Sequence, residues 1–174
     1  MFHSKPQTTP ERAQAIDTEA LFRRLLRDYQ QPLYWHIRHV VGSHEDAEDA
    51  LQETFIRVYR NIDTLRNALS ERAWLYRIAT NEALRIAKEA KPMLAYDPLD
   101  EPEAPPMPDF DDIQQALAAA IESLPPKQRA VFSMRYYDNL SYDDIARACD
   151  SNVKAVTSNY HVAKEKIREF ILSL

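Results

Sequence analysis

Glycine is nearly absent from this chain, since Gly42 is the only one among 174 residues. A Walker A loop or a dinucleotide-binding fingerprint needs several glycines so that the backbone can wrap a phosphate. Nucleotide-binding sites of those two kinds are therefore excluded. A glycine-poor chain rich in Ala, Leu, Arg and Glu favours helices joined by short turns, and we expect an all-α protein.

Cysteines and long apolar runs are equally scarce. Cys149 is the single cysteine, so no disulfide can form within the chain, and a reducing, cytoplasmic setting is expected. The first ten residues are polar and do not resemble a signal peptide. No run of about 18 apolar residues could span a membrane.

Patterns for metal binding and catalysis are also missing. No histidine follows a glutamate at the Glu-x-x-His spacing of a di-iron bundle, and no Cys/His set suits zinc. No serine lies in a recognisable nucleophile motif. We expect no metal, no cofactor and no enzymatic activity.

Basic charge is limited, because the net charge at pH 7 is −5. Residues 92–112 hold seven Asp or Glu and no Lys or Arg, whereas residues 1–91 and 113–174 each carry a net charge of +1. Non-specific DNA affinity comes largely from neutralising phosphates. If this chain reads DNA, a partner must supply part of the affinity.

The acidic segment also divides the chain. It contains six prolines, which break helices, and its like charges repel one another. We therefore interpret residues 92–112 as a flexible linker. The prediction is two small helical domains, residues 17–91 and 113–174, after a flexible N-terminus of residues 1–16.

Apolar spacing and capping residues predict four helices in the first domain. Pro32 suits the first turn of a helix, and Gly42 can end that helix in a left-handed conformation. Ser43 begins a capping-box-like sequence. The four helices are expected to start at Asp17, Pro32, Ser43 and Ser70.

The second domain also predicts four helices, the last two forming a helix-turn-helix. A short helix over residues 141–148, a turn at 149–151 and a longer helix capped by Asn152 fit that motif. The outer face of the long helix carries side chains that can reach base edges and phosphates in a major groove. They are Lys154, Thr157, Ser158, Asn159, His161 and Lys164. The alternative is a solvated helix on a helical bundle.

The helix that begins at Ser70 presents a second stripe. Arg77, Asn81, Arg85 and Lys88 fall on one side, with Trp74 one turn earlier. Cations beside an aromatic ring suit single-stranded or melted nucleic acid. The alternative places the tryptophan in the core and the cations in solvent.

In this order, the segments resemble the extracytoplasmic-function (group IV) sigma factors of bacterial RNA polymerase. Residues 46–60 (DAEDALQETFIRVYR) resemble the family's region 2 helix, and residues 73–85 (AWLYRIATNEALR) resemble the helix that follows. Residues 124–132 (LPPKQRAVF) and 140–146 (LSYDDIA) resemble region 4. The resemblance covers about 20–91 and 113–172.

The resemblance implies a role for each surface. Region 2 would dock on the clamp helices of the polymerase's largest subunit through Asp49, Gln52, Glu53 and Ile56. The next helix would melt and read the minus-10 element through Trp74, Arg77, Asn81, Arg85 and Lys88. Region 4 would bind the flap of the second-largest subunit. It would read the minus-35 element through Arg129, Lys154, Thr157, Ser158, Asn159, His161 and Lys164.

The recognition helix departs from the family's usual pattern. Asp150 stands where the turn usually carries Gly, and Ser151 where it carries an apolar residue. The usual run TVKSRLHRA reads AVTSNYHVA here, so Thr157, Asn159 and Val162 replace three cations. Fewer cations weaken phosphate binding, which predicts a weakened or altered reading of the minus-35 element.

The sequence therefore predicts a sigma factor that binds core RNA polymerase and directs promoter recognition, melting and initiation. Members of the family are often held inactive by an anti-sigma factor, and we expect one here. Two alternatives stay open: a helix-turn-helix regulator that binds duplex DNA without polymerase, and a sigma-like adaptor or decoy that binds polymerase or an anti-sigma factor without productive initiation.

Overall fold

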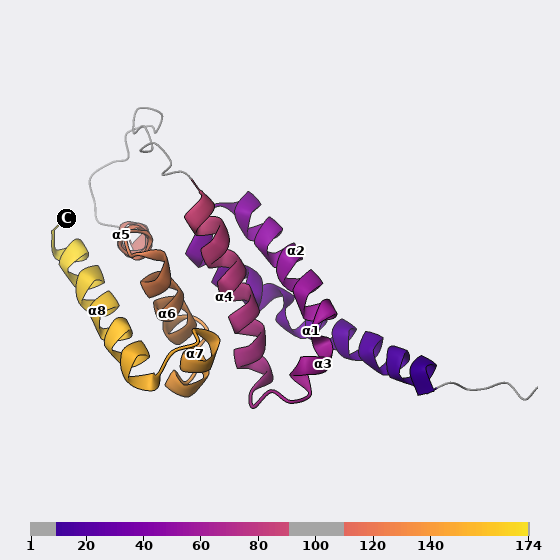
Figure 1. Cartoon of the computed structure of the whole chain (residues 1–174). Coiled ribbons are helices and arrows are strands. Elements are labelled where there is room, and N and C mark those ends of the chain that lie inside the picture. Colours follow the sequence, from indigo (N-terminus) through magenta and orange to yellow (C-terminus); the bar gives the residue numbers. More distant parts are fainter. Residues whose placement is uncertain (1–9, 91–109, 174) are drawn as a thin grey trace, which may run out of the picture.

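The computed structural model describes residues 10–90 and 110–173, and every element in these two stretches is a helix (Figure 1). The predicted all-α fold is confirmed. The first stretch contains α1 (Pro10–Val41), α2 (His44–Arg60), α3 (Ile62–Leu65) and α4 (Glu71–Glu89). The second contains α5 (Phe110–Glu122), α6 (Pro126–Tyr136), α7 (Tyr142–Ala148) and α8 (Val153–Leu172). Most of the predicted linker lies outside the described residues.

The predicted helix boundary at Pro32 is wrong, because α1 runs unbroken through this residue and starts at Pro10 rather than Asp17. An interior proline costs about 3 kcal/mol, since it removes a backbone donor and crowds the preceding turn. Leu25, Leu33 and Ile37 are fully buried on both sides of the proline. Burying each such side chain contributes about 1.5–3 kcal/mol, so the continuous apolar face outweighs the local cost.

Four of the predicted helix starts after α1 are confirmed by side-chain caps. Each cap accepts a hydrogen bond from a first-turn amide, which satisfies one of the free N–H groups at a helix start. The pairs are Ser43 with Asp46 (3.1 Å), Ser70 with Ala73 (3.1 Å), Ser141 with Asp144 (3.1 Å) and Asn152 with Ala155 (2.8 Å). Gly42 ends α1 at φ +83°, the left-handed conformation expected of it. The one-turn helix α3 was not predicted.

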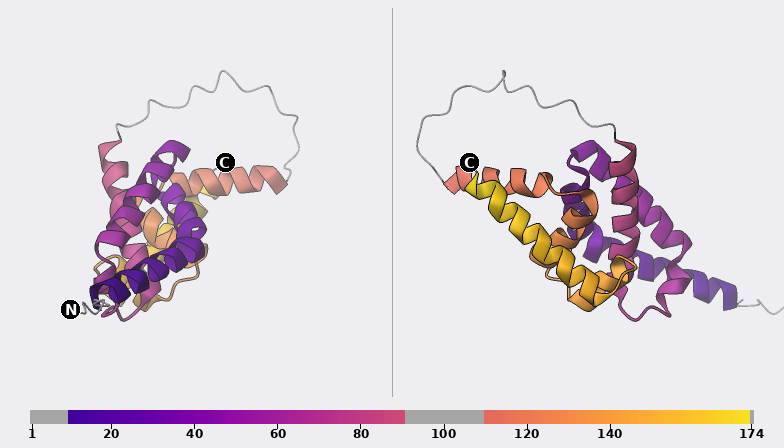
Figure 2. Two further views of the ribbon diagram at one scale, coloured as in Figure 1. Left: turned by 90° about the vertical axis from the view of Figure 1, so that its right-hand side faces the viewer. Right: turned by 60° about the vertical axis from the view of Figure 1, so that its left-hand side comes forward.

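The two halves of the chain pack against each other through a shared apolar core. Helices α1, α2 and α4 form one bundle, against which α6 and α7 pack on the α1 and α4 side (Figures 1 and 2). Leu33 and Ile37 of α1 belong to the same buried cluster as Val131 and Met134 of α6. A smaller cluster joins α5, α6 and α8 around Phe132. The sequence predicted the two bundles but not their contact.

None of the described helices is long and apolar enough to cross a membrane.

Candidate nucleic-acid interface

Helices α7 and α8 form the predicted helix-turn-helix. The turn places Asp150 at φ +51°, so an aspartate adopts the left-handed conformation that glycine adopts most easily. The amide of Ser151 then donates to the carbonyl of Ala146 (2.9 Å), which closes the end of α7. Asn152 caps α8. The turn thus keeps the geometry of the motif despite its unusual residues.

The inward side of α8 is fixed by Val156, Ala163 and Ile167, all buried. The opposite side leaves five of the predicted base- and phosphate-reading residues exposed: Lys154, Ser158, Asn159, His161 and Lys164. Thr157 is half-buried and its hydroxyl donates to the carbonyl of Val153 (2.7 Å). Its hydrogen is therefore engaged by the backbone. The side of α8 that could contact DNA therefore has five exposed polar side chains, whereas six were predicted from the sequence.

Arg129 occupies a different environment from the other predicted minus-35 residues. Its guanidinium donates to three backbone carbonyls: Glu122 (2.8 Å), Leu124 (3.0 Å) and, across to α1, Val40 (3.0 Å). Burial lowers the pKa of the Arg129 guanidinium. In this arrangement the side chain holds the end of α5 and bridges to α1 instead of facing solvent.

The predicted minus-10 stripe lies along α4. Asn81 and Lys88 are exposed, whereas Trp74 is half-buried against the core. Arg77 lies 3.8 Å from the carboxylate of Asp150 in the helix-turn-helix. Four of the five predicted residues are thus exposed to solvent: Arg77, Asn81, Arg85 and Lys88. Trp74 packs against the core but stays partly exposed, so its position fits both a structural role and a role in binding.

A buried carboxylate organises the C-terminal half of this stripe. Glu82, almost completely buried, accepts from Arg85 (3.1 Å) and pairs with Arg57 of α2 (2.6 Å). Arg85 also reaches Glu89 (3.2 Å). These ion pairs hold α2 and α4 together and fix the direction of the Arg85 guanidinium. No pattern in the sequence indicated that Glu82 would be buried.

The predicted polymerase-binding residues form one face of α2. Asp49, Gln52 and Ile56 are exposed, and Glu53 is half-exposed. All four line a cleft of about 530 Å³ together with Arg85 of α4. The structure therefore places the predicted polymerase-binding face directly beside part of the predicted minus-10 stripe.

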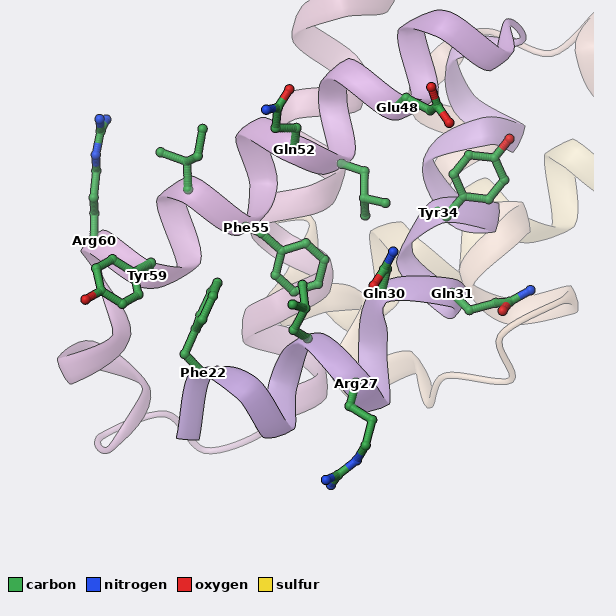
Figure 3. A pocket seen from close by; sticks show the side chains of 13 residues that line it. Phe22, Arg27, Gln30, Gln31, Tyr34, Glu48, Gln52, Phe55, Tyr59 and Arg60 are labelled. Atoms are coloured by element: carbon green, nitrogen blue, oxygen red, sulfur yellow. The ribbon is translucent and has the colours of Figure 1, made fainter. Parts of the chain in front are cut away.

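A larger apolar groove of about 970 Å³ runs between α1 and α2 (Figure 3). Phe22 of α1 and Phe55 of α2 point into it, and their rings meet edge-on with centroids 6.2 Å apart. Tyr59, 54% exposed, packs against Phe22. Sequence reasoning named two lining residues, Gln52 and Ile56, but missed the aromatic ones. The only sequence signal for these aromatic residues was the apolar stripe on their helix. The helix that packs against this stripe could not be predicted from the sequence.

Two chemical features bear on other functions. Burial raises the pKa of the Cys149 thiol to about 11, so this thiol stays protonated and weakly nucleophilic at neutral pH. Among residues 10–90 and 110–173, no group of three or more His, Cys, Asp or Glu side chains could hold a metal ion.

Family models match both halves of the chain. Residues 25–91 match Sigma-70 region 2, and residues 114–167 match Sigma-70 region 4. The ECF RNA polymerase sigma-E factor of Escherichia coli K12 is 31% identical over 181 residues, covering 92% of this chain and 91% of that protein. The ECF RNA polymerase sigma factor SigE of Mycolicibacterium smegmatis is 32% identical over 156 residues. That match covers 84% of this chain but only 60% of the longer relative.

Solved structures show the same fold. The sigma factor RpoE of Bartonella quintana, in complex with the anti-sigma factor NepR, gives a TM-score of 0.65 at 20% identity, covering 86% of this chain and 96% of that one. CnrH, in complex with the cytosolic domain of CnrY, gives 0.68 at 19% identity, covering 89% and 90%. With both regions matched in order and a relative aligned along nearly its whole length, the chain belongs to the extracytoplasmic-function sigma factors, which direct transcription initiation by RNA polymerase.

Proposed function

We propose that this chain binds core RNA polymerase mainly through region 2, assigned to residues 17–91, and selects promoters mainly through the minus-10 stripe of α4. The observation that supports this proposal is the arrangement of side chains where α2 meets α4. There the predicted polymerase-binding residues Gln52, Glu53 and Ile56 share a cleft with Arg85. A polymerase element docked on α2 would lie next to the DNA read by α4.

The α4 stripe suits melted DNA in its charge and its exposure. Asn81 and Lys88 are open to solvent. Arg77 is exposed and pairs with the exposed Asp150. Arg85 is exposed and pairs with the exposed Glu89 as well as with the buried Glu82. Exposed ion pairs contribute little to stability, so a DNA phosphate could displace Asp150 or Glu89 at small cost while Glu82 keeps Arg85 in place. Trp74, half-buried at the N-terminal end, offers a ring on which a base could stack.

Region 4, assigned to residues 113–174, contributes less to promoter choice in this proposal. Lys154 and Lys164 remain as cations on the outer face of α8, while Thr157 is engaged by its own helix and Arg129 by backbone carbonyls. Each phosphate contact that is lost lowers both the affinity and its salt dependence. We expect a weak or altered minus-35 element and affinity supplied largely by the polymerase.

The α1–α2 groove is the second surface for which we propose a partner. The sigma factor RpoE, whose fold this chain shares, was solved in complex with the anti-sigma factor NepR. By this likeness we propose that an anti-sigma factor also binds this chain. The exposed aromatic and aliphatic side chains of Tyr59 and Ile56 provide an apolar surface beside the polymerase-binding face. A partner seated there would compete with the polymerase.

In vitro transcription tests the proposal. Purified core polymerase, this chain and a pool of genomic promoter fragments should yield transcripts whose start sites share an upstream motif. The double variant Arg77→Ala and Arg85→Ala should abolish most of them. Arg23→Ala with Arg168→Ala is a matched control, because it removes two exposed, ion-paired arginines from α1 and α8.

The outcomes separate the alternatives. Binding to core polymerase without any transcripts would favour the adaptor or decoy. Tight binding to duplex DNA without polymerase would favour an independent helix-turn-helix regulator. Equal loss of transcripts in the control variant would contradict the role given to α4.

A further inference from the structure

One buried carboxylate holds two arginines that come from different helices. Helices α2 and α4 lie side by side (Figure 1), and the Glu82 side chain of α4 is only 4% exposed. Its Oε1 atom lies 2.6 Å from Nε of Arg57 on α2, and its Oε2 atom lies 3.1 Å from Nε of Arg85 on α4. Each guanidinium group therefore has one oxygen of the same carboxylate to itself.

The guanidinium group of Arg57 is anchored at one end and free at the other. Its Nε atom contacts Glu82 and lies 3.3 Å from Glu53. The side chain is 47% exposed, and its terminal Nη1 and Nη2 atoms form no hydrogen bond with the described residues. Glu82 thus fixes the direction of the group and leaves its outer N–H groups open. Such a fork of N–H groups matches the oxygens of a phosphate.

Arg85 places a second cation beside the first. Its Nε and Nη2 atoms face Glu82, and its Nη1 atom lies 3.2 Å from Glu89. Glu89 is 65% exposed, and exposed ion pairs contribute little to stability. A phosphate can therefore take the place of Glu89 while Glu82 keeps Arg85 in position. Glu53, the outer partner of Arg57, is also partly exposed.

The packing of α2 against α4 does not account for the whole arrangement. Arg57 joins the two helices through its Nε atom, whereas the ion pair of Arg85 with Glu82 lies within one helix. The terminal N–H groups of Arg57 are not needed for the contact, because Nε is the atom that approaches Glu82. Both arginines therefore keep cationic groups at the surface that packing does not require.

The position of the pair connects it to the surface proposed to bind DNA. Arg85 belongs to the minus-10 stripe, and Asn81 and Lys88, about one turn away on either side, are exposed. Arg57 extends this stripe from α4 onto the neighbouring helix α2. A strand bound along α4 would meet two ordered cations at the edge that faces α2.

We infer that Arg57 and Arg85 form a single phosphate-binding site for the promoter strand, with Glu82 as its positioning residue. The inference rests on the proposed reading of the minus-10 element by α4 and adds a residue of α2 to it. Contact with a phosphate fixes the position of a strand without reading its bases. Because Glu82 has already ordered both guanidinium groups, less side-chain freedom is lost when the strand binds.

The salt dependence of promoter binding tests this inference. Core polymerase saturated with the full chain is titrated into a dye-labelled promoter fragment from the transcription experiment, whose minus-10 segment is mismatched and therefore already melted. Arg57→Gln removes the cation but keeps a side-chain amide that can still donate to Glu82. It should weaken binding about fivefold at about 0.1 M salt and reduce the slope of log K against log salt concentration by about 0.7, the contribution of one phosphate of a single strand.

Two further variants separate phosphate binding from folding. Arg57→Lys retains the charge but not the planar fork, so it should keep the wild-type slope and weaken binding roughly twofold. Arg23→Gln is the matched control, because it removes an exposed, ion-paired arginine from α1 and should change neither quantity. Circular dichroism and binding to core polymerase show which variants remain folded. If Arg57→Gln does not fold, unchanged affinity of Arg57→Lys would overturn the inference.

A double-mutant comparison tests the role of Glu82. In a Glu82→Gln background the guanidinium group of Arg57 is no longer anchored, so the loss caused by Arg57→Gln should fall from about fivefold to about twofold. If Glu82 only held the helices together, that loss would be the same in both backgrounds.

Two results would overturn the inference: a wild-type slope in folded Arg57→Gln, or an equal loss in both Glu82 backgrounds. Failure of the wild-type chain with core polymerase to bind the melted fragment would contradict the proposed function itself, and the inference with it. The failure of the inference alone is therefore distinguishable from failure of the proposed function.

Discussion

Replacing Asp138 with asparagine should stabilise the protein at neutral and alkaline pH. Burial raises the pKa of the Asp138 carboxyl from 3.8 to about 6, although the Tyr76 hydroxyl and the Arg72 charge act in the opposite direction. One pKa unit corresponds to about 1.4 kcal/mol, so holding this carboxylate ionised in the folded state costs on the order of 3 kcal/mol. Asparagine keeps the shape of the side chain and has no charge to bury.

The pH dependence of this effect has a defined sign. A raised pKa means that the folded state binds the proton more tightly, so the penalty is complete above pH 6. It diminishes as the pH falls through 6 and is gone below about 3.8. The asparagine variant should therefore exceed wild type by up to about 3 kcal/mol in free energy of unfolding at pH 8, and by little at pH 4.

The buried histidines of α1 affect the stability of the Asp138→Asn variant and of the wild-type protein equally. Burial lowers the pKa of His36 from 6.5 to about 3 and also lowers the pKa of His39. Protonation of these groups favours the unfolded chain, so both proteins lose stability as the pH falls below 6.5. The difference between variant and wild type removes this shared trend and isolates the carboxylate.

Urea denaturation at pH 8, 6 and 4.5, followed by circular dichroism, measures the difference. Asp63→Asn is the control, because Asp63 is exposed on α3 and its replacement should change stability by less than about 0.5 kcal/mol. Equal stability of the Asp138 variant and wild type at pH 8, or a gap that widens in acid, would refute this account of the buried carboxylate.

Three further predictions concern stability and are checked by the same denaturation measurement. Asn152→Ala removes the cap of α8 and should cost about 1 kcal/mol, whereas Asn152→Asp should cost little. Gly42→Ala forces a side chain into the left-handed region in otherwise open space, so the backbone alone should make it cost about 1–2 kcal/mol. Glu82→Gln removes the buried charge that pairs with Arg57 and should cost about 2 kcal/mol. Unchanged stability in any of the three would contradict the role assigned to that residue.

Local chemistry explains why much of the fold could be predicted. Four helix caps, the left-handed Gly42 and the helix-turn-helix each depend on residues a few positions apart. Local sequence patterns are therefore enough to predict them. The helix boundary predicted at Pro32 was wrong because local helix rules do not take the burial of side chains into account. Leu25 and Leu33 are buried in a cluster to which α2, α4 and α6, helices far away in the sequence, also contribute.

The residues that sequence reasoning missed depend on distant partners. Phe22 lines a groove only because α2 brings Phe55 opposite to it. Asp138 looks like an ordinary turn residue, yet the contact with α1 and α4 buries it against His36. Arg129 carries the charge expected of a DNA-binding residue, but it is engaged by carbonyls of α1 and of the segment after α5. Such roles follow from tertiary packing, which local patterns do not specify.

Binding to core RNA polymerase tests the central claim most directly. Fluorescence anisotropy of the labelled chain, titrated with purified core enzyme, should give saturable binding. Ile56→Glu places a charge on the exposed apolar side chain shared by the α2 face and the groove, and should weaken binding at least tenfold without loss of helicity. Ile171→Glu is the control at a similarly exposed position on α8. No binding by the wild-type chain, or no difference between Ile56→Glu and wild type, would contradict the account.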